Sequence, residues 1–121
     1  MATIVKRSTG GNLQLTLAVA SGITSGDPVI VGVSLFGFAI TDRDSAGNAV
    51  VQVPYSTVVD MEVEAVNNAG ASAVAIGDII YYEAGEDPIL NKDGVSGLQY
   101  GIALEVIASG TDTINILLIG V

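Results

Sequence analysis

The feature that most constrains this chain is a strict alternation of apolar and polar residues, because a period of two places every second side chain on one face of a β-strand. Residues 13–18 are Leu-Gln-Leu-Thr-Leu-Ala, and residues 59–64 are Val-Asp-Met-Glu-Val-Glu. A helix through the second segment is the rival interpretation. The β-branched run Thr57, Val58 and Val59 favours a strand, since such side chains are restricted in a helix. Both segments are predicted strands, the second with three carboxylates on its polar face.

Six further segments have the composition of short strands, and turn sequences rich in glycine, asparagine and aspartate separate them. These predicted strands cover residues 29–33, 35–41, 50–54, 79–83, 100–107 and 113–119. The chain has 15 glycines and no convincing amphipathic helix. This spacing favours a barrel or sandwich over an α/β fold. We expect an all-β fold, a small β-barrel or β-tulip-like domain with short strands and long loops.

An internal repeat runs through the predicted strands. Each copy contains a Gly-Asp turn, Gly26-Asp27 or Gly77-Asp78, followed by a strand and then by a second strand with a central glycine, Gly37 or Gly101. Glycine inside a strand marks a bulge, a bend or a close approach of backbones, and each Asp can cap its turn. The second copy carries a longer connection, predicted to be a surface loop over residues 84–97.

The first eleven residues are predicted to be a flexible arm, followed by one β domain over residues 12–121 that contains the repeat. The arm combines a β-prone Thr3-Ile4-Val5 with Lys6-Arg7, the only adjacent basic pair in the chain. Such a segment can add a strand to the sheet edge of a partner. The alternative is a frayed terminus without a function.

The balance of apolar and charged residues indicates that much of the surface is covered. Hydrophobic residues make up 50% of the chain and charged residues 14%, and the mean hydropathy is +0.59. A core alone does not account for this, so we expect further apolar surface to be covered by contact between subunits or with a partner. No membrane span is predicted, because glycine and serine interrupt the longest apolar stretch, residues 28–40, which is shorter than the roughly 20 residues required. Residues 1–9 lack the order of a secretory signal, so synthesis and assembly are expected in the cytoplasm.

The charge of the chain disfavours nucleic acid as a partner. Four basic residues oppose 13 acidic ones, for a net charge of −9. Binding to nucleic acid requires clustered basic side chains, whereas Arg43 and Lys92 each stand alone in the sequence.

The chain lacks the residue types on which most catalysis depends. It has no histidine and no cysteine, and Lys6 and Lys92 are its only lysines. Neither lysine has the surroundings expected of a buried general base, so no catalytic residue is predicted. Residues 42–53 resemble a calcium-binding loop at three positions, but Ala46 and Val53 occupy ligand positions, so a hairpin loop is favoured and no metal site is predicted. No lysine follows a glycine, so a phosphate-binding loop is absent and no cofactor is expected.

The repeats and the C-terminal strand resemble the capsid cement, or decoration, proteins of tailed bacteriophages. Five segments carry this resemblance, which spans residues 10–121: 24–32, 35–39, 75–82, 101–105 and 110–118. Members of this family often carry an older label as RecA/RadA-type phage recombinases, which the missing phosphate-binding loop argues against. The resemblance implies a non-enzymatic β-barrel-like virion protein that trimerises on the outer surface of the phage head, binds the major capsid protein and stabilises the capsid.

Two other functions remain open at the level of sequence. One is a different phage part, such as a tail, neck or fibre module. The other is a carbohydrate-binding β domain, which would present exposed aromatic side chains beside Asp or Asn on one face. A cement protein is expected to bury its aromatic residues instead.

Overall fold

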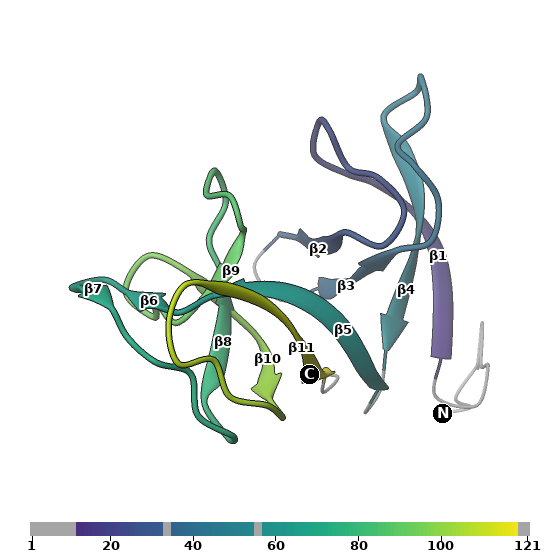
Figure 1. Cartoon of the computed structure of the whole chain (residues 1–121). Helices are drawn as coiled ribbons and strands as arrows, with labels where there is room; N and C mark the ends of the chain where they lie inside the picture. Colours follow the sequence, from purple (N-terminus) through teal and green to yellow (C-terminus); the bar gives the residue numbers. More distant parts are fainter. Residues whose placement is uncertain (1–11, 33–34, 55–56, 119–121) are drawn as a thin grey trace, which may run out of the picture.

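A computed structural model describes residues 12–32, 35–54 and 57–118, and all regular structure in this part of the chain is β-strand (Figure 1). The prediction of an all-β fold with a small barrel is confirmed. Among the described residues, no helix is present that could cross a membrane. The arm, residues 1–11, lies outside the described residues, and the division into arm and domain stays a prediction.

The first half of the chain forms a four-stranded antiparallel sheet in the order β1-β4-β3-β2. Its strands are β1 (Asn12–Ala18), β2 (Pro28–Val31), β3 (Leu35–Ala39) and β4 (Asn48–Pro54). The alternation that predicted β1 is reflected in its exposure: Leu15 and Leu17 are half-buried, whereas Gln14 and Thr16 are exposed. A small apolar cluster of Val29, Ala39 and Val51 forms the core of this sheet.

The second half forms a closed five-stranded barrel in the order β10-β11-β5-β9-β8. Its strands are β5 (Thr57–Glu64), β8 (Ile79–Tyr82), β9 (Leu90–Asn91), β10 (Leu98–Ala103) and β11 (Thr111–Leu118), and β6 (Val66–Asn67) pairs with β7 (Gly70–Ala71) in a separate hairpin. On β5, Met61 and Val63 are buried, whereas Asp60 and Glu62 are exposed and Glu64 is half-buried. The predicted separation of apolar and acidic faces on this strand is confirmed.

Two predicted segments of the second half are wrong in detail. The stretch 84–97 is not only a surface loop, because it contains β9, whose Leu90 is fully buried and closes the barrel between β5 and β8. The strand predicted over residues 100–107 ends at Ala103, where the chain bends. Ile107 instead forms an isolated bridge with Val74.

The Gly-Asp turn of the first half is fixed by hydrogen bonds to its own side chain and to β3. The amide of Thr24 donates to the Asp27 carboxylate (2.9 Å), and the amide of Asp27 donates to the Thr24 carbonyl (3.0 Å). The amide of Gly26 donates to the carbonyl of Ala39, whose own amide donates to the Asp27 carbonyl. Gly26 has a φ of +92°, which a residue with a side chain rarely adopts.

The Gly-Asp turn of the second half makes the same contacts. The amide of Ala75 donates to the Asp78 carboxylate (2.8 Å), and the amide of Gly77 donates to the carbonyl of Ala103 (2.8 Å). The amide of Ala103 donates back to the Asp78 carbonyl (2.9 Å). The two halves also share one strand order, since β1-β4-β3-β2 corresponds to β5-β11-β10-β8. The sequence repeat therefore coincides with a repeat of hydrogen bonds, and β9 converts the second sheet into a barrel.

Gly37 and Gly101 occupy matching positions on β3 and β10, each against the next strand of its sheet. A Cβ atom on Gly37 would collide with the backbone carbonyl oxygen of Gln52 in β4. A Cβ atom on Gly101 would lie 2.5 Å from the Ile116 side chain and 2.9 Å from the Leu117 carbonyl oxygen in β11. Both positions require glycine because neighbouring strands approach closely there.

The main core lies inside the barrel and extends to side chains from the first half. Its fully buried members include Val63, Ile80, Leu90, Ala103, Ile116 and Leu118. Phe36 of β3 belongs to this core and packs edge-on against Tyr100 of β10, with ring centroids 5.7 Å apart. The two halves are thus held together by a shared apolar core.

Candidate functional site

The outer wall of the barrel carries a continuous row of aliphatic side chains across four strands. Ile79 of β8 pairs with Ile102 of β10, Ile102 with Leu117 of β11, and Leu117 with Val58 of β5. Val58 is 52% exposed and Ile79 38%, and the two central members are half-buried. We call these four residues the outer apolar row. It faces away from the core, because alternate residues on the same strands, such as Ile116, fill the barrel interior.

Further apolar side chains are exposed close to one end of this row. Ile76 is 68% exposed and Val106 is 64% exposed. Their segments run side by side, since Val74 bridges Ile107 and the amide of Gly77 bonds Ala103. Exposed aliphatic residues gathered on one surface mark an interaction site more strongly than isolated ones.

The outer face of β5 changes from apolar to acidic within two residues. Val58 ends the outer apolar row, and Asp60 and Glu62 follow on the same face. Opposite them on β11 lie Asn115 and Thr113. The row therefore has a polar border, which is the usual arrangement at the margin of a protein interface.

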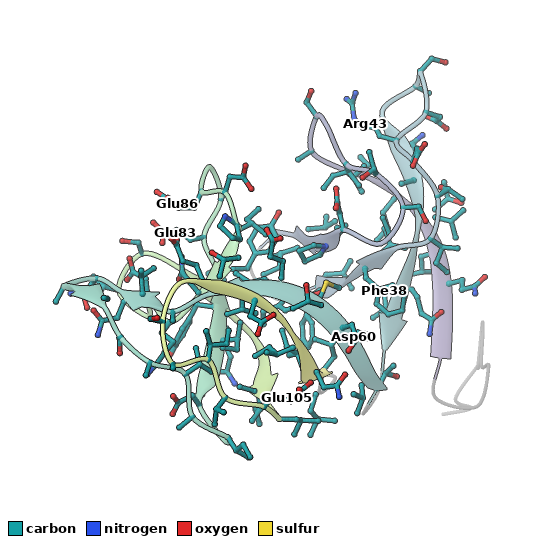
Figure 2. All side chains as sticks on the ribbon, in the orientation of Figure 1. Phe38, Arg43, Asp60, Glu83, Glu86 and Glu105 are labelled. Carbon is teal, nitrogen blue, oxygen red and sulfur yellow. The ribbon has the colours of Figure 1, made fainter. Side chains whose placement is uncertain are left out.

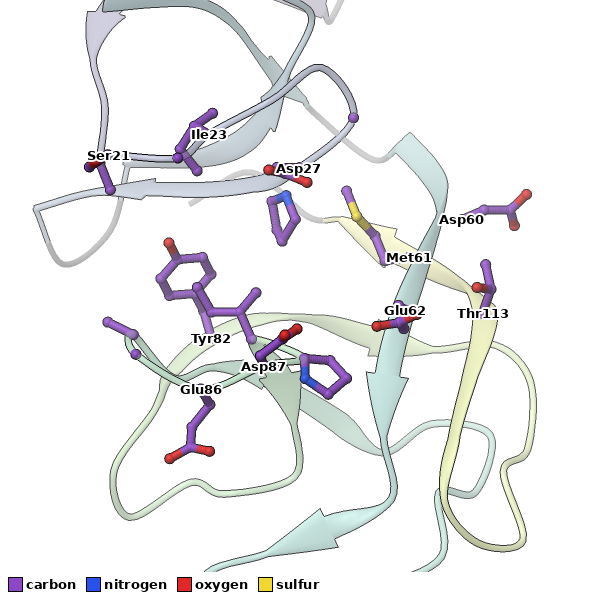
Figure 3. Close-up of a pocket in the computed structure, with 18 residues that line it drawn as sticks. Ser21, Ile23, Asp27, Asp60, Met61, Glu62, Tyr82, Glu86, Asp87 and Thr113 are labelled. Carbon is purple, nitrogen blue, oxygen red and sulfur yellow. The ribbon is translucent and has the colours of Figure 1, made fainter. Parts of the chain in front are cut away.

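A cleft of about 580 Å³ lies between the two halves (Figure 3). One wall is the segment 20–28 of the first half, and the other comes from β5, Thr113 of β11 and the segment 84–89 of the barrel. Met61 and Tyr82, both largely buried, contribute apolar surface. The volume falls in the range of pockets that bind small ligands or peptide side chains.

Five carboxylates line this cleft, which we call the acidic cleft, and no basic side chain among the described residues does. They are Asp27, Asp60, Glu62, Glu86 and Asp87. Figure 3 shows Asp27, Glu62 and Asp87 turned toward its centre, with Asp60 and Glu86 at its margins. In the part of the chain that the structure describes, no group of acidic side chains is arranged to hold a metal ion. The negative charge is therefore spread along the cleft.

Tyr82 presents its hydroxyl to the cleft without a hydrogen-bond partner among the described residues. Its side chain points toward the first half (Figure 3), although only 8% of the residue is exposed. Burial raises the pKa of Tyr82, and the negative charge of Asp27 raises it further. The phenol stays protonated and is available to a ligand in the cleft.

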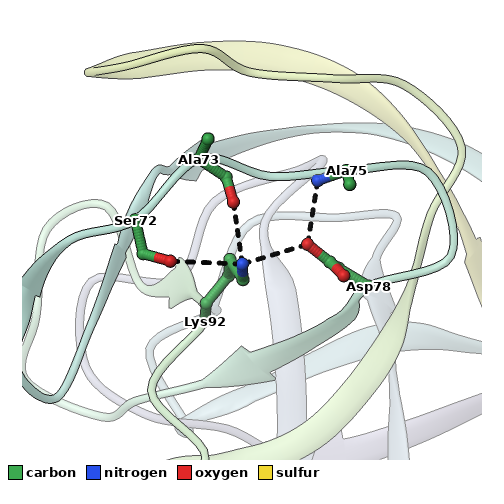
Figure 4. A network of polar contacts seen from close by, with 5 residues as sticks. All are labelled: Ser72, Ala73, Ala75, Asp78 and Lys92. Carbon is green, nitrogen blue, oxygen red and sulfur yellow. Dashed lines mark hydrogen bonds and ion pairs between the residues drawn. The ribbon is translucent and has the colours of Figure 1, made fainter.

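The basic side chains of the described residues lie elsewhere. The ammonium group of Lys92 is 3.0 Å from the Asp78 carboxylate and donates to the Ala73 carbonyl (2.7 Å) and to Ser72 (Figure 4). The hydrogen bond from the Ala75 amide and then Lys92 lower the pKa of Asp78. The Arg43 side chain donates to the carbonyl of Val19, and its amide donates to the carbonyl of Ile23, so Arg43 lies beside the segment 20–23 but does not itself line the cleft. Figure 2 shows its side chain apart from Asp60 and Glu86.

The residues singled out from the sequence fall into two groups. The turn residues Gly26, Asp27, Gly77 and Asp78 stabilise the fold, as do the strand glycines, and of these only Gly26 and Asp27 line the acidic cleft. The predicted partner-binding residues Thr3, Ile4, Val5, Lys6 and Arg7 lie outside the described residues. The structure therefore describes the positions of the first group alone, and the role of the second group stays a prediction.

The loop that resembled a calcium site uses its carboxylates within the turn. Asp44 accepts hydrogen bonds from the amides of Ala46 and Asn48, and Asp42 accepts one from the amide of Ser25. These contacts agree with the hairpin interpretation of residues 42–53.

Sequence reasoning missed the outer apolar row, although a signal was present. Ile79-Ile80 and Leu117-Leu118 are apolar pairs inside strands, and adjacent strand residues point to opposite faces. Such pairs predict a strand that is apolar on both faces, as in a sheet covered on both sides.

Comparison with known proteins gives one match. A family model described as phage cement protein matches residues 7–118. No curated protein and no solved structure matches the chain.

Proposed function

Because this chain belongs to the phage cement protein family, as its sequence predicted, we propose that it binds the outer surface of a phage head and stabilises the capsid. The family implies a structural role at the phage capsid rather than catalysis. The proposed partner is the major capsid protein, and assembly onto the head takes place in the host cytoplasm.

The observation that best supports this proposal is the outer apolar row. Val58, Ile79, Ile102 and Leu117 form a surface that water covers in the isolated molecule. Burying an aliphatic side chain is worth about 1.5–3 kcal/mol when it is fully exposed beforehand, so four partly exposed ones supply several kcal/mol to an interface. A protein that must occupy many equivalent positions on a shell benefits from such a surface together with a repulsive charge of −9 that limits aggregation.

We assign the outer apolar row to contacts between three copies of the chain, and the arm to the capsid. In this arrangement the row lies near a three-fold axis and its acidic border, Asp60 and Glu62, stays in water. On the head, Thr3-Ile4-Val5 adds a strand to a sheet edge of the capsid protein, and Lys6-Arg7 meets acidic side chains there.

The test is decoration of heads that lack the cement protein. Purified full-length protein is titrated onto such heads, bound copies are counted, and the temperature at which heads release DNA is recorded. We expect saturable binding in proportion to the capsid subunits and a higher release temperature. Val58→Asp should weaken both effects, whereas Ala18→Asp, which places the same residue at an exposed site of β1, should not.

The alternatives make different predictions in the same assay. A tail, neck or fibre module would copurify with tails and leave heads unchanged. A carbohydrate-binding domain is disfavoured by the burial of Phe36, Tyr82 and Tyr100, because sugar stacking requires exposed aromatic faces. Failure to bind heads at saturating protein would exclude the proposed function.

A further inference from the structure

The first half of the chain is an incomplete copy of the barrel formed by the second half. Its strand order β1-β4-β3-β2 corresponds to β5-β11-β10-β8, and in the second half β9 pairs with both end strands, β5 and β8. The sequence accounts for the difference, because Gly101 follows Gly77 by 24 positions whereas Gly37 follows Gly26 by only 11. The additional residues of the second copy include β9. In the described sheet of the first half, β1 and β2 are therefore left as the two edges (Figure 1).

Burial in the two halves differs where β9 covers the interior of the barrel. Matching the paired residues Ala39 and Val51 with Ala103 and Ile116 aligns the two halves strand by strand. Four apolar residues of the first half are only half-buried, although their counterparts in the barrel are 8% exposed or less. These pairs are Leu17 with Met61, Val19 with Val63, Val31 with Tyr82, and Val53 with Leu118. Among the described residues, the interior of the first half thus has no equivalent of the strand that covers the interior of the second.

The backbone at the end of β1 faces this uncovered side. The amide of Val19 donates to the carbonyl of Gly47 on the side of β4 (3.0 Å). Successive residues of a strand direct their backbone groups to opposite edges, so those of Ala18 point away from β4. β1 contains seven residues without a charge, a proline or a glycine, and an edge strand that lacks these features is a template for a further strand.

The backbone of β2 presents the matching edge. The amide of Ala39 donates to the Asp27 carbonyl (2.9 Å). Because bonded and non-bonded pairs alternate along β2 and β3, the backbone groups of Ile30 point away from β3. Ile30 corresponds to Tyr81, whose partner on that side is Asn91 of β9. We call this edge of β2 and the end of β1 described above the open edges, since no strand among the described residues pairs with them.

β9 shows what occupies the position between two such edges. Leu90 of β9 pairs with Val63 of the parallel strand β5 and with Tyr82 of the antiparallel strand β8. Its side chain is fully buried in the barrel. The corresponding neighbours in the first half are Val19 and Val31, so a strand between the open edges places one aliphatic side chain between these two valines.

The described part of the chain has no segment to supply this strand, because its strands already pair with one another. A segment joined directly to the start of β1 would run antiparallel to β1, whereas a parallel neighbour requires a crossover of about a dozen residues or more. The edge strand of a second copy does not fit either, since it belongs to a sheet on one side and the position pairs on both. The strand required is a single extended segment of another protein.

The charges near the open edges indicate the composition of this segment. β1 and β2 carry no charged residue. Beyond the end of β1, Arg43 donates to the Val19 carbonyl (3.2 Å), and no carboxylate of the described chain forms an ion pair with it. A strand parallel to β1 leads toward this cation, so an uncharged segment followed by an acidic residue complements the surface.

We propose that an extended segment of the major capsid protein inserts between the open edges and completes the first half as a second barrel. The identity of the partner rests on the proposed function, whereas the open edges follow from the repeat. Main-chain hydrogen bonds to Ala18 and Ile30 supply affinity, and the aliphatic side chain between Val19 and Val31 supplies specificity, as in other cases of strand addition.

Hydrogen exchange of the full-length protein, free and bound to heads, tests the proposal directly. In the free protein the Ile30 amide faces an open edge, so it should exchange rapidly, and on heads its exchange should slow by at least about tenfold. The amide of Ala39, which donates to the Asp27 carbonyl in the free protein, is the internal control and should exchange slowly in both states. Mass spectrometry of short fragments after quenching measures both amides.

Photo-cross-linking identifies the strand that is added. Val31 packs against the small core of the first half, so Val31→photoleucine places a small diazirine beside the position of the new strand. Illumination of decorated heads should join it to one segment of the capsid protein. Val95→photoleucine, at a residue 77% exposed between β9 and β10, carries the same group elsewhere and should not label that segment. Peptide mapping by mass spectrometry locates both products.

A measurement without capsids examines the open edges separately. The probe is a synthetic peptide with the sequence of residues 87–92 of this chain, which includes β9. Added in excess to the free, full-length protein, it should shift the NMR signals of the Ala18 and Ile30 amides, because it can pair with the open edges as β9 pairs in the barrel. The same peptide with Leu90→Asp is the control and should shift neither signal, since burying an unpaired charge is unfavourable.

Four results would overturn the proposal. Decorated heads on which Ile30 exchanges as in the free protein and Val31→photoleucine gives no capsid product would exclude it and leave the proposed function standing. A cross-link only to residues 1–11 of the same or a neighbouring copy would reassign the strand to this chain. Equal effects of the two peptides would show that the open edges do not accept a strand. Peptide binding by a protein that does not bind heads would exclude the proposed function and, with it, the capsid protein as the partner.

Discussion

The hydroxyl of Tyr100 donates a 2.6 Å hydrogen bond to the backbone carbonyl of Gly37, across 63 residues of sequence. Tyr100 belongs to the barrel and is 1% exposed, and Gly37 belongs to the sheet of the first half. Gly37 is the strand glycine of the first repeat. Tyr100 directly precedes Gly101, the strand glycine of the second repeat. The two repeats are therefore joined at their most closely packed strands, and burial raises the pKa of Tyr100 so that the donor stays protonated.

Tyr100→Phe removes this hydroxyl donor, so the buried carbonyl of Gly37 loses the hydrogen bond from Tyr100. We expect the free energy of unfolding to fall by about 1–3 kcal/mol, since a buried polar group that loses its partner keeps its desolvation cost. Urea denaturation measures the change. Tyr81→Phe is the control, because Tyr81 is only half-buried and its hydroxyl makes no hydrogen bond to a described residue; it should change stability by less than about 0.5 kcal/mol. Equal stability of the two variants would contradict the role of the Tyr100–Gly37 bond.

Valine at Gly101 or Gly37 is expected to destabilise the fold, Gly101→Val by about 1–3 kcal/mol. Gly37→Val should cost more, because its added atoms meet the rigid backbone of Gln52, whereas at Gly101 the nearest atom is a methyl group of Ile116. Ala18→Val, at an exposed site of β1, adds similar volume without a collision. Thermal melts compare the three variants. If Gly37→Val and Gly101→Val both melt at the temperature of the parent, the close approach of the strands does not require glycine at these positions.

An element of this fold can be predicted from the sequence when neighbouring residues determine it, and cannot when distant strands determine it. The strands at Thr57–Glu64 and Thr111–Leu118 follow from local alternation and β-branched composition, which act over neighbouring residues. β9 is only two residues long and is buried because β5 and β8 enclose it, so no local pattern identifies it. Ile107 continues an apolar run in the sequence, yet it pairs with Val74 after the chain bends.

The candidate site was less predictable than the fold. The outer apolar row depends on cross-strand register, which aligns Ile79, Ile102, Leu117 and Val58 from four strands. The acidic cleft joins segments 20–28 and 84–89 to β5, and sequence alone does not show that these segments meet. The acidic face of β5 was predicted, but its position beside a cleft follows only from the packing of the two halves.

Acid should weaken the second Gly-Asp turn. The pKa of Asp78 is lowered by the Ala75 amide and by Lys92, so its carboxylate stabilises the fold above the ordinary aspartate pKa of about 3.9, and this contribution is lost as the pH falls through the lower folded value. We expect Asp78→Asn to reduce stability by about 0.5–1 kcal/mol at pH 7, a modest figure because the pair is partly exposed. The difference from the parent should shrink below about pH 4.

Asp27→Asn provides the matched comparison for that prediction. Asp27 accepts the same backbone hydrogen bond in the first turn but has no lysine among its contacts in the described chain. Its substitution should therefore cost less than that of Asp78. Urea denaturation of both variants between pH 3 and pH 7, in steps of about one unit, gives the two profiles. A constant difference between Asp78→Asn and the parent across this range would show that the ionised carboxylate contributes nothing.

The outer apolar row predicts that the protein associates through the barrel wall. Light scattering of the parent should give about three times the 12.2 kDa mass of the chain at high protein concentration. Leu117→Asp places a charge at the centre of the row, where a trimer contact would desolvate it without a partner, and unpaired charges in an interface are strongly unfavourable. We expect this variant to remain monomeric and folded, since Leu117 is half-buried and lies on the outer face of the barrel.

The control for association is Gln99→Asp, an exposed position on the neighbouring strand β10, which introduces the same residue outside the row. Circular dichroism of both variants distinguishes loss of association from loss of fold. If Leu117→Asp forms the same assembly as the parent, the copies meet through another surface. If the parent is monomeric at every concentration, the outer apolar row contacts the capsid instead of other copies. Leu117→Asp should then weaken binding to heads by at least about tenfold, or roughly 1.4 kcal/mol.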